Sequence, residues 1–188
     1  MSTYSTKSTI PDTLARTTLV LGGTRSGKSK FAEALFENKS CPVYMATAEA
    51  LDVEMKFRIE AHKKARGSRW QTVEAPLELV SAILTYSKSG HPILVDCLSL
   101  WISNLLMADR VLDDEIALLL QSLPKLDSPV VFVSTEVGLG GIAMNELARR
   151  YADAIGMLHQ ALSAEVQRTY WVVAGISILI KSEKTNDY

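Results

Sequence analysis

Apolar and polar positions divide the chain into short aliphatic runs that alternate with longer amphipathic segments. Runs rich in Val, Ile and Leu that are bounded by Gly, Pro or polar residues predict β-strands. Segments with apolar residues at i, i+3, i+4 and i+7 predict helices. The expected strands cover residues 17–21, 42–46, 70–76, 91–97 and 129–134, followed by a hairpin of 170–174 and 176–180 about Gly175. The expected helices cover residues 30–36, 52–66, 77–86, 98–107, 112–123 and 144–168.

Strands that alternate with helices predict an α/β fold: three layers around a mostly parallel sheet, with an antiparallel C-terminal edge. The near-continuous apolar run at 129–134 is typical of a parallel strand buried on both faces. On helix 144–168 the expected buried face comprises Leu147, Tyr151, Ala154, Leu158 and Leu162. We expect residues 17–188 to form a single domain. Residues 1–16, which are rich in Ser and Thr, should form a flexible extension.

Composition narrows the class of protein. With 47% hydrophobic and 22% charged residues, the chain has ordinary globular values. A formal net charge of -1, with basic residues spread along the sequence, indicates neither nucleic acid nor an anionic membrane as partner and favours a small-molecule substrate. The longest apolar stretch, residues 170–180, is shorter than the ~20 residues that span a bilayer. Cys41 and Cys97 lie outside any CxxC pair, which fits a reducing cytoplasm better than a disulfide framework.

The first apolar run leads directly into a complete phosphate-binding loop. Its residues are Gly22, Gly23, Thr24, Arg25, Ser26, Gly27, Lys28 and Ser29, which match the pattern GxxxxGK[ST]. Glycines allow backbone N–H groups to close around an anion, Lys28 supplies a point charge, and Ser29 supplies a hydroxyl for Mg²⁺. A chance glycine-rich turn is the weaker alternative, because a strand precedes the loop and a helix follows it. The loop therefore predicts a nucleoside triphosphate as ligand.

Two further features follow strands of the expected sheet. An aliphatic run at 93–95 ends in Asp96, the arrangement of an aspartate that organises Mg²⁺ beside a phosphate loop. Because apolar runs often end in Asp, this prediction depends on the phosphate loop. Residues 135–141 form a polar, glycine-rich loop after the strand at 129–134, and open α/β sheets place ligands at such carboxyl ends.

His62 is open to two interpretations. On the expected helix 52–66, Met55, Ile59 and His62 share one face, so His62 could end an apolar stripe and satisfy its nitrogens locally. A second series, which recurs every four residues, comprises Glu54, Arg58, His62 and Arg66. This series would suit a functional site or a solvated ion-pair face equally well.

Several motifs occur together and in order, and they resemble those of a known family. They are the phosphate loop, Tyr44-Met45-Ala46-Thr47, Asp52-x-Glu54-Met55-x-x-Arg58-Ile59-x-x-His62, Trp70-x-Thr72-x-Glu74, Asp96-Cys97-Leu98-Ser99-Leu100-Trp101-x-x-Asn104-Leu105-Leu106 and Val133-Ser134-x-Glu136-Val137-Gly138. From residue 17 to 181 the chain resembles the bifunctional adenosylcobinamide kinase / adenosylcobinamide-phosphate guanylyltransferase family of cobalamin biosynthesis. It departs from the family pattern at Thr135, usually Asn, and at 141–144, usually Gly-Ile-Val-Pro.

The resemblance implies two reactions on the aminopropanol arm of a corrinoid. ATP or GTP phosphorylates the hydroxyl of adenosylcobinamide, and GMP from GTP is then transferred to that phosphate, which gives adenosylcobinamide-GDP and pyrophosphate. In this family a histidine at the position of His62 is guanylylated as an intermediate. The family consists of homotrimers with a RecA-like P-loop NTPase sheet. Its other nucleotide contacts fall on Thr47, Ala48, Glu49, Lys63, Lys64, Ala65, Arg66, Glu74 and Asp96.

The residues alone leave two other functions open. One is a simple P-loop kinase of small molecules, in which His62 is structural. The other is a non-catalytic nucleotide-binding subunit, in which the loop at 135–141 reports the nucleotide state to a partner.

Overall fold

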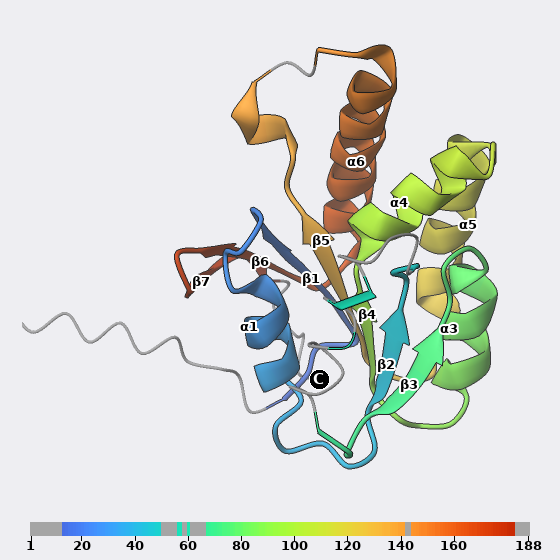
Figure 1. Cartoon of the computed structure of the whole chain (residues 1–188). Coiled ribbons are helices and arrows are strands. Elements are labelled where there is room, and N and C mark those ends of the chain that lie inside the picture. Colours follow the sequence, from blue (N-terminus) through green and yellow to red (C-terminus); the bar gives the residue numbers. More distant parts are fainter. Residues whose placement is uncertain (1–12, 50–55, 58–59, 61–66, 142–143, 183–188) are drawn as a thin grey trace, which may run out of the picture.

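The computed structural model describes residues 13–49, 56–57, 60, 67–141 and 144–182, and within them seven strands form one sheet (Figure 1). The strands are β1 (Thr17–Gly22), β2 (Val43–Ala46), β3 (Gln71–Glu74), β4 (Ile93–Asp96), β5 (Val130–Thr135), β6 (Arg168–Val173) and β7 (Ile176–Ser182). Their order across the sheet is β3-β2-β4-β5-β1-β6-β7. All neighbouring pairs run parallel except β6 and β7. The predicted parallel sheet with an antiparallel C-terminal edge is confirmed.

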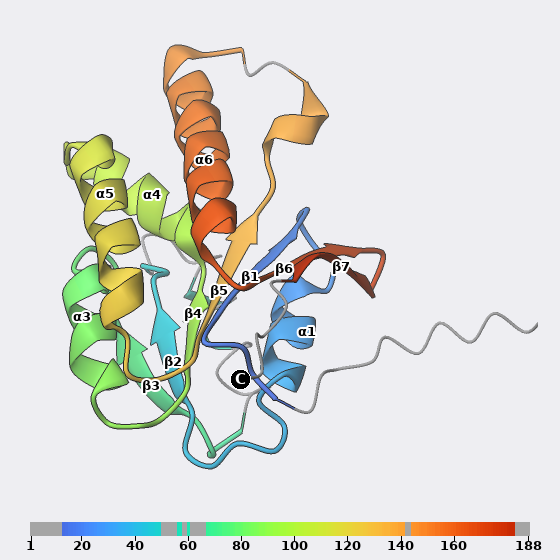
Figure 2. The same ribbon diagram turned by 180° about the vertical axis from the view of Figure 1, so that it is seen from behind.

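Helices cover both faces of this sheet (Figure 2). They are α1 (Lys28–Ala34), α3 (Leu79–Ser87), α4 (Leu98–Met107), α5 (Leu112–Ser122) and α6 (Glu146–Glu165), with 3-10 turns η1 (Leu123–Lys125) and η2 (Gly138–Gly140). Helix α1 packs on one face, and α3 to α6 pack on the other, which gives the predicted three layers. None of the described helices has both the length and the apolar character needed to cross a membrane.

The core is divided between the two faces by the alternation of side chains along each strand. In β1, Leu19 and Leu21 belong to the apolar cluster under α3 to α6, whereas Val20 belongs to the cluster under α1. Every residue of β1 is buried, as expected for a central parallel strand. The predicted core residues Trp101 and Leu105 are fully buried on α4.

Helix α6 differs from its prediction at both ends. It ends at Glu165, not Arg168, because Arg168 starts β6 and pairs with Thr18 of β1 and Ser182 of β7. At its other end Leu147 is 60% exposed, so the predicted apolar face is buried only from the second turn onward. The long-range pairing of β6 therefore decides where the helix ends.

The segment that leads into β1 packs against the core and against the residue before β6. Within the predicted extension 1–16, Leu14 packs against the core, and the Arg16 guanidinium donates to the carbonyls of Pro124 and Leu126. The Arg16 N–H donates to Gln167 Oε1 at 2.7 Å, so this residue is fixed against the segment before β6. Residues 1–12 and 183–188 lie outside the described residues, as does most of the predicted helix 52–66, where Lys56, Phe57 and Glu60 are helical.

Candidate functional site

The carboxyl ends of the parallel strands gather the predicted site residues at one edge of the sheet. Ala46 of β2 pairs with both Glu74 of β3 and Asp96 of β4. Asp96 in turn pairs with Val133 of β5, and Thr135 of β5 pairs with Gly22 of β1. The phosphate loop, Asp96 and the loop after β5 therefore lie side by side, since β5 stands between β1 and β4.

The phosphate loop is shaped by close backbone approaches. A Cβ on Gly22 would come within 2.4 Å of the Val172 carbonyl oxygen, so this position requires glycine. Gly27 has φ 96°, and the space for its Cβ is limited by the Cα of Gly175 at 3.3 Å. The Gly175 N–H also donates to the Ser26 carbonyl at 2.8 Å. The turn of the C-terminal hairpin thus supports the loop from behind.

The side chains of the loop are arranged to meet an anion. Thr24 and Arg25 are exposed, and Lys28 and Ser29, in the first turn of α1, are half-buried. Lys28 Nζ donates to the Gly23 carbonyl at 3.3 Å, which folds the ammonium group over the loop. The Ser26 hydroxyl is buried and has no hydrogen-bond partner among the described residues. An unsatisfied hydroxyl beside a lysine fits a loop that receives phosphate oxygens.

Asp96 is held at the carboxyl end of β4 by a contact that the sequence did not reveal. The Tyr44 hydroxyl donates to Asp96 Oδ2 at 2.8 Å. The described residues contain no group of three or more His, Cys, Asp or Glu that could hold a metal ion. A hydroxyl on Ser29 and a carboxylate on Asp96 nevertheless fit Mg²⁺, which binds nucleotide phosphates with only one or two protein oxygen ligands.

Thr47 supports this edge from within the protein. Its side chain is fully buried, and its hydroxyl accepts from the Cys97 N–H at 2.9 Å and donates to the Cys97 carbonyl at 2.8 Å. Asn104 Nδ2 donates to the carbonyls of Thr47 and Pro76, at 2.7 and 3.0 Å, and so joins the ends of β2 and β3. The hydroxyl of Thr47 is thereby committed to the backbone after Asp96.

The remaining predicted contacts are more dispersed. Ala48 and Glu49, directly after Thr47, are half-buried at the same edge. Glu74 is exposed on the edge strand β3, four strand spacings or roughly 19 Å from β1. The predicted nucleophile and the contacts after it lie outside the described residues; they are His62, Lys63, Lys64, Ala65 and Arg66.

A second polar cluster lies where β5 ends, and sequence reasoning missed it. His159 of α6 places Nε2 2.7 Å from Ser134 Oγ and Nδ1 3.3 Å from Glu136 Oε2. Burial lowers the pKa of His159, and the nearby Glu136 only partly opposes that effect, so the imidazole is neutral near pH 7. A histidine within an apolar stripe, four residues after Ile155 and three before Leu162, was the available signal.

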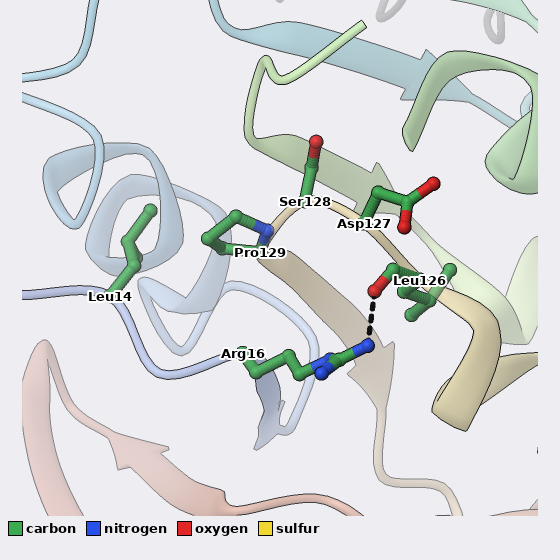
Figure 3. A pocket seen from close by; sticks show the side chains of 6 residues that line it. All are labelled: Leu14, Arg16, Leu126, Asp127, Ser128 and Pro129. Atoms are coloured by element: carbon green, nitrogen blue, oxygen red, sulfur yellow. Dashed lines mark hydrogen bonds between the residues drawn. The ribbon is translucent and has the colours of Figure 1, made fainter. Parts of the chain in front are cut away.

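A cavity of about 400 Å³ opens at the other end of the parallel strands, near the amino ends of β1 and β5 (Figure 3). It is lined by Leu14, Arg16, Leu126, Asp127, Ser128 and Pro129. The Arg16 side chain is already bonded to the backbone there. None of the predicted nucleotide contacts lines this cavity, so it is separate from the candidate site.

Comparison with known proteins agrees with the motifs. Residues 18–180 match the family described as cobinamide kinase / cobinamide phosphate guanyltransferase. The bifunctional adenosylcobalamin biosynthesis protein CobP of Pseudomonas aeruginosa is 44% identical over 168 residues, which cover 88% of this chain and 97% of that protein. The corresponding CobU protein of Salmonella typhimurium is 36% identical over 178 residues, 87% of this chain and 98% of that protein.

The fold is similar to that of a solved protein of different sequence. A Pyrococcus horikoshii protein superposes with a TM-score of 0.53 at 10% identity, over 92% of this chain and 89% of that chain. At this identity the similarity concerns the fold alone.

Proposed function

Because the chain belongs to the cobinamide kinase / cobinamide phosphate guanyltransferase family, we propose that one nucleotide site, built on residues 22–29, serves both of its reactions. The enzyme is a kinase and a nucleotidyltransferase of cobalamin biosynthesis. Family membership favours this function over a simple kinase or a non-catalytic subunit. The observation that carries the shared site is that the sequence contains a single GxxxxGK[ST] motif, which lies beside β5 and near Asp96.

In the kinase step, the loop binds the phosphates of ATP or GTP so that the γ-phosphorus meets the hydroxyl of adenosylcobinamide. Charge that builds on the leaving diphosphate is stabilised by the loop N–H groups and Lys28. The buried Ser26 hydroxyl, unsatisfied in the described structure, supplies a further donor. The same groups would stabilise the pyrophosphate that leaves in the second step.

Mg²⁺ would be held by the hydroxyl of Ser29 and the carboxylate of Asp96. When bound, it supplies positive charge beside the β- and γ-phosphates. The hydrogen bond from Tyr44 fixes one oxygen of Asp96 and orients the carboxylate. The other predicted contacts, at Ala48, Glu49, Glu74 and the segment 63–66, would bind the rest of the nucleotide. Thr47 would hold the backbone next to them in place.

The guanylyl transfer proceeds through His62. A nitrogen of the neutral imidazole bonds to the α-phosphorus of GTP as the bond to the β-phosphate breaks and pyrophosphate leaves. A phosphate oxygen of adenosylcobinamide phosphate then bonds to the same phosphorus, and the bond to the histidine nitrogen breaks. Adenosylcobinamide-GDP results, and the imidazole is regenerated.

Incubation of the protein with α-labelled GTP and Mg²⁺ tests this route. A phosphoramidate should leave label on the protein that is labile in acid and stable in base. His62→Ala should remove both the label and guanylyl transfer, and a chelator should prevent labelling of the parent. His91→Ala is the matched control, because His91 precedes β4 at the opposite edge of the sheet. Guanylyl transfer at an undiminished rate by His62→Ala would exclude the histidine as nucleophile.

The family resemblance implies a homotrimer, and the apolar side chains that the hairpin exposes would suit a contact between subunits; Ile176, Ile178, Leu179 and Ile180 are each about half exposed. Sedimentation equilibrium should give three times the monomer mass of 20.7 kDa. Both cysteines are free thiols, which fits a cytoplasmic enzyme. The net charge of -1 gives no reason to expect a nucleic acid partner.

A further inference from the structure

We propose that Glu136 accepts the proton of the substrate hydroxyl in the kinase step and that His159 positions it. This inference rests on the proposed use of the phosphate loop for that step. A hydroxyl is a weak nucleophile, and a carboxylate within reach of its proton assists phosphoryl transfer in other kinases. In the loop after β5, residues 136–141, Glu136 is the one carboxylate, and its backbone N–H contacts the phosphate loop at Gly22.

The topology places Glu136 between the phosphate loop and Asp96. Strand β5 stands between β1, which leads into the phosphate loop, and β4, which ends in Asp96. The Glu136 N–H donates to the Gly22 carbonyl at 3.1 Å, so its backbone touches the first glycine of the loop. The acceptor hydroxyl must approach the γ-phosphorus at this edge, since the phosphates are bound from the loop side.

The carboxylate is fixed on two sides and remains accessible. Glu136 Oε1 accepts from the Gly138 N–H at 2.6 Å, and Oε2 lies 3.3 Å from His159 Nδ1. A Cβ on residue 138 would approach Oε1 to 3.0 Å, so glycine there leaves room for the carboxylate. The Glu136 side chain is 19% exposed, whereas that of His159 is 7% exposed. Of the two side chains, that of Glu136 is therefore the more open to a substrate.

The imidazole orients Glu136 without neutralising it. A neutral tautomer that donates from Nδ1 to Glu136 and accepts at Nε2 from the Ser134 hydroxyl satisfies all three groups. Burial disfavours the charged imidazole, so His159 places no full positive charge beside the carboxylate. Ser, His and Glu in this order also form hydrolytic triads, but Ser134 is fully buried and its hydroxyl cannot attack a substrate.

As the substrate oxygen bonds to the γ-phosphorus, its O–H bond breaks and the proton moves to an oxygen of Glu136. The bond between the γ-phosphorus and the β–γ bridging oxygen breaks, and the nucleoside diphosphate leaves with that electron pair. Glu136 then releases the proton to water.

The test measures the two reactions separately in Glu136→Gln: phosphorylation of adenosylcobinamide by GTP, and guanylyl transfer from GTP to supplied adenosylcobinamide phosphate. Gln is isosteric, can accept from Gly138, and can donate to His159 in its other tautomer. We expect kcat of the kinase step to fall by about 10²–10⁴-fold, with KM for GTP and the second reaction unchanged. Glu136→Asp, which keeps a carboxylate, should retain more kinase activity. Glu165→Gln, at the exposed end of α6, is the matched control.

A double-variant cycle separates positioning from simple support. His159→Gln should lower kcat of the kinase step by about tenfold or more, and should have no further effect in the Glu136→Gln background. Equal losses in both reactions, or a kinase step that Glu136→Gln leaves unchanged, would overturn the inference. A different result would contradict the proposal that both reactions share one nucleotide site. In that case Lys28→Ala would retain one of the two reactions.

Discussion

Thr47→Val tests whether the hydroxyl of Thr47 supports the site or contacts the nucleotide. Val keeps the shape of Thr but removes the group that accepts from the Cys97 N–H and donates to its carbonyl. That carbonyl keeps the N–H donors of Leu100 and Trp101, whereas the N–H has no second acceptor among the described residues. Leaving the buried Cys97 N–H without an acceptor costs about 1–3 kcal/mol of stability, and losing the hydrogen bond from the Thr47 hydroxyl to the Cys97 carbonyl costs about 1 kcal/mol. We therefore expect the free energy of unfolding to fall by about 2–4 kcal/mol.

Urea unfolding measures this loss, provided that the slope of unfolding free energy against urea concentration is unchanged. Titration with GTP under native conditions measures nucleotide affinity. Thr47→Ser is the control; it keeps the hydroxyl, loses one buried methyl group, and should cost about 1 kcal/mol. Both variants should bind GTP as the parent does. A Thr47→Val protein that is as stable as the parent but binds GTP about tenfold more weakly, a change of about 1.4 kcal/mol, would refute the reasoning.

Four further predictions concern Lys28, Asp96 and the two cysteines. Lys28→Ala should abolish both reactions and leave the melting temperature unchanged, since Lys28 donates within the loop and adds little to the core. Asp96→Asn should raise the Mg²⁺ concentration needed for half-maximal turnover; a much lower melting temperature with an unchanged Mg²⁺ titration would make Asp96 structural. Iodoacetamide at about pH 8 should alkylate exposed Cys41 and spare Cys97, because burial and then Asp96 raise the pKa of Cys97 to about 11. The stability that this neutral thiol contributes is lost as pH rises from 9.0 through 11, so the urea midpoint should fall there.

The parts of the fold that could be predicted are encoded within single segments. A strand such as β5, apolar at successive positions, has to be buried on both faces. The hairpin turn was predictable from Gly175, because Gly freely adopts the positive φ, 78°, that the turn requires there; the positive φ of Ala174, 50°, has no such signal in the sequence. The end of α6 was not predictable, because the pairing of Arg168 with strands far along the chain decides it.

The same distinction applies to the candidate site. The phosphate loop follows from a local pattern of eight residues, and Asp96 from the strand before it. The contacts that hold the site join residues far apart in the chain: Tyr44 to Asp96, Thr47 to Cys97, and Ser134 to His159. No periodicity in the sequence encodes these pairs, since they depend on the order of strands and on the helix that crosses above them.

The hydrogen bond between Gly175 and Ser26 links the hairpin of β6 and β7 to the phosphate loop. The hairpin that supplies this bond also carries the exposed apolar side chains of β7. A neighbouring subunit seated on those side chains would restrict the hairpin, and the turn would pass that restriction to the backbone that encloses the phosphates. In the proposed trimer, nucleotide affinity and subunit association would then be thermodynamically linked, and each would strengthen the other by the same factor.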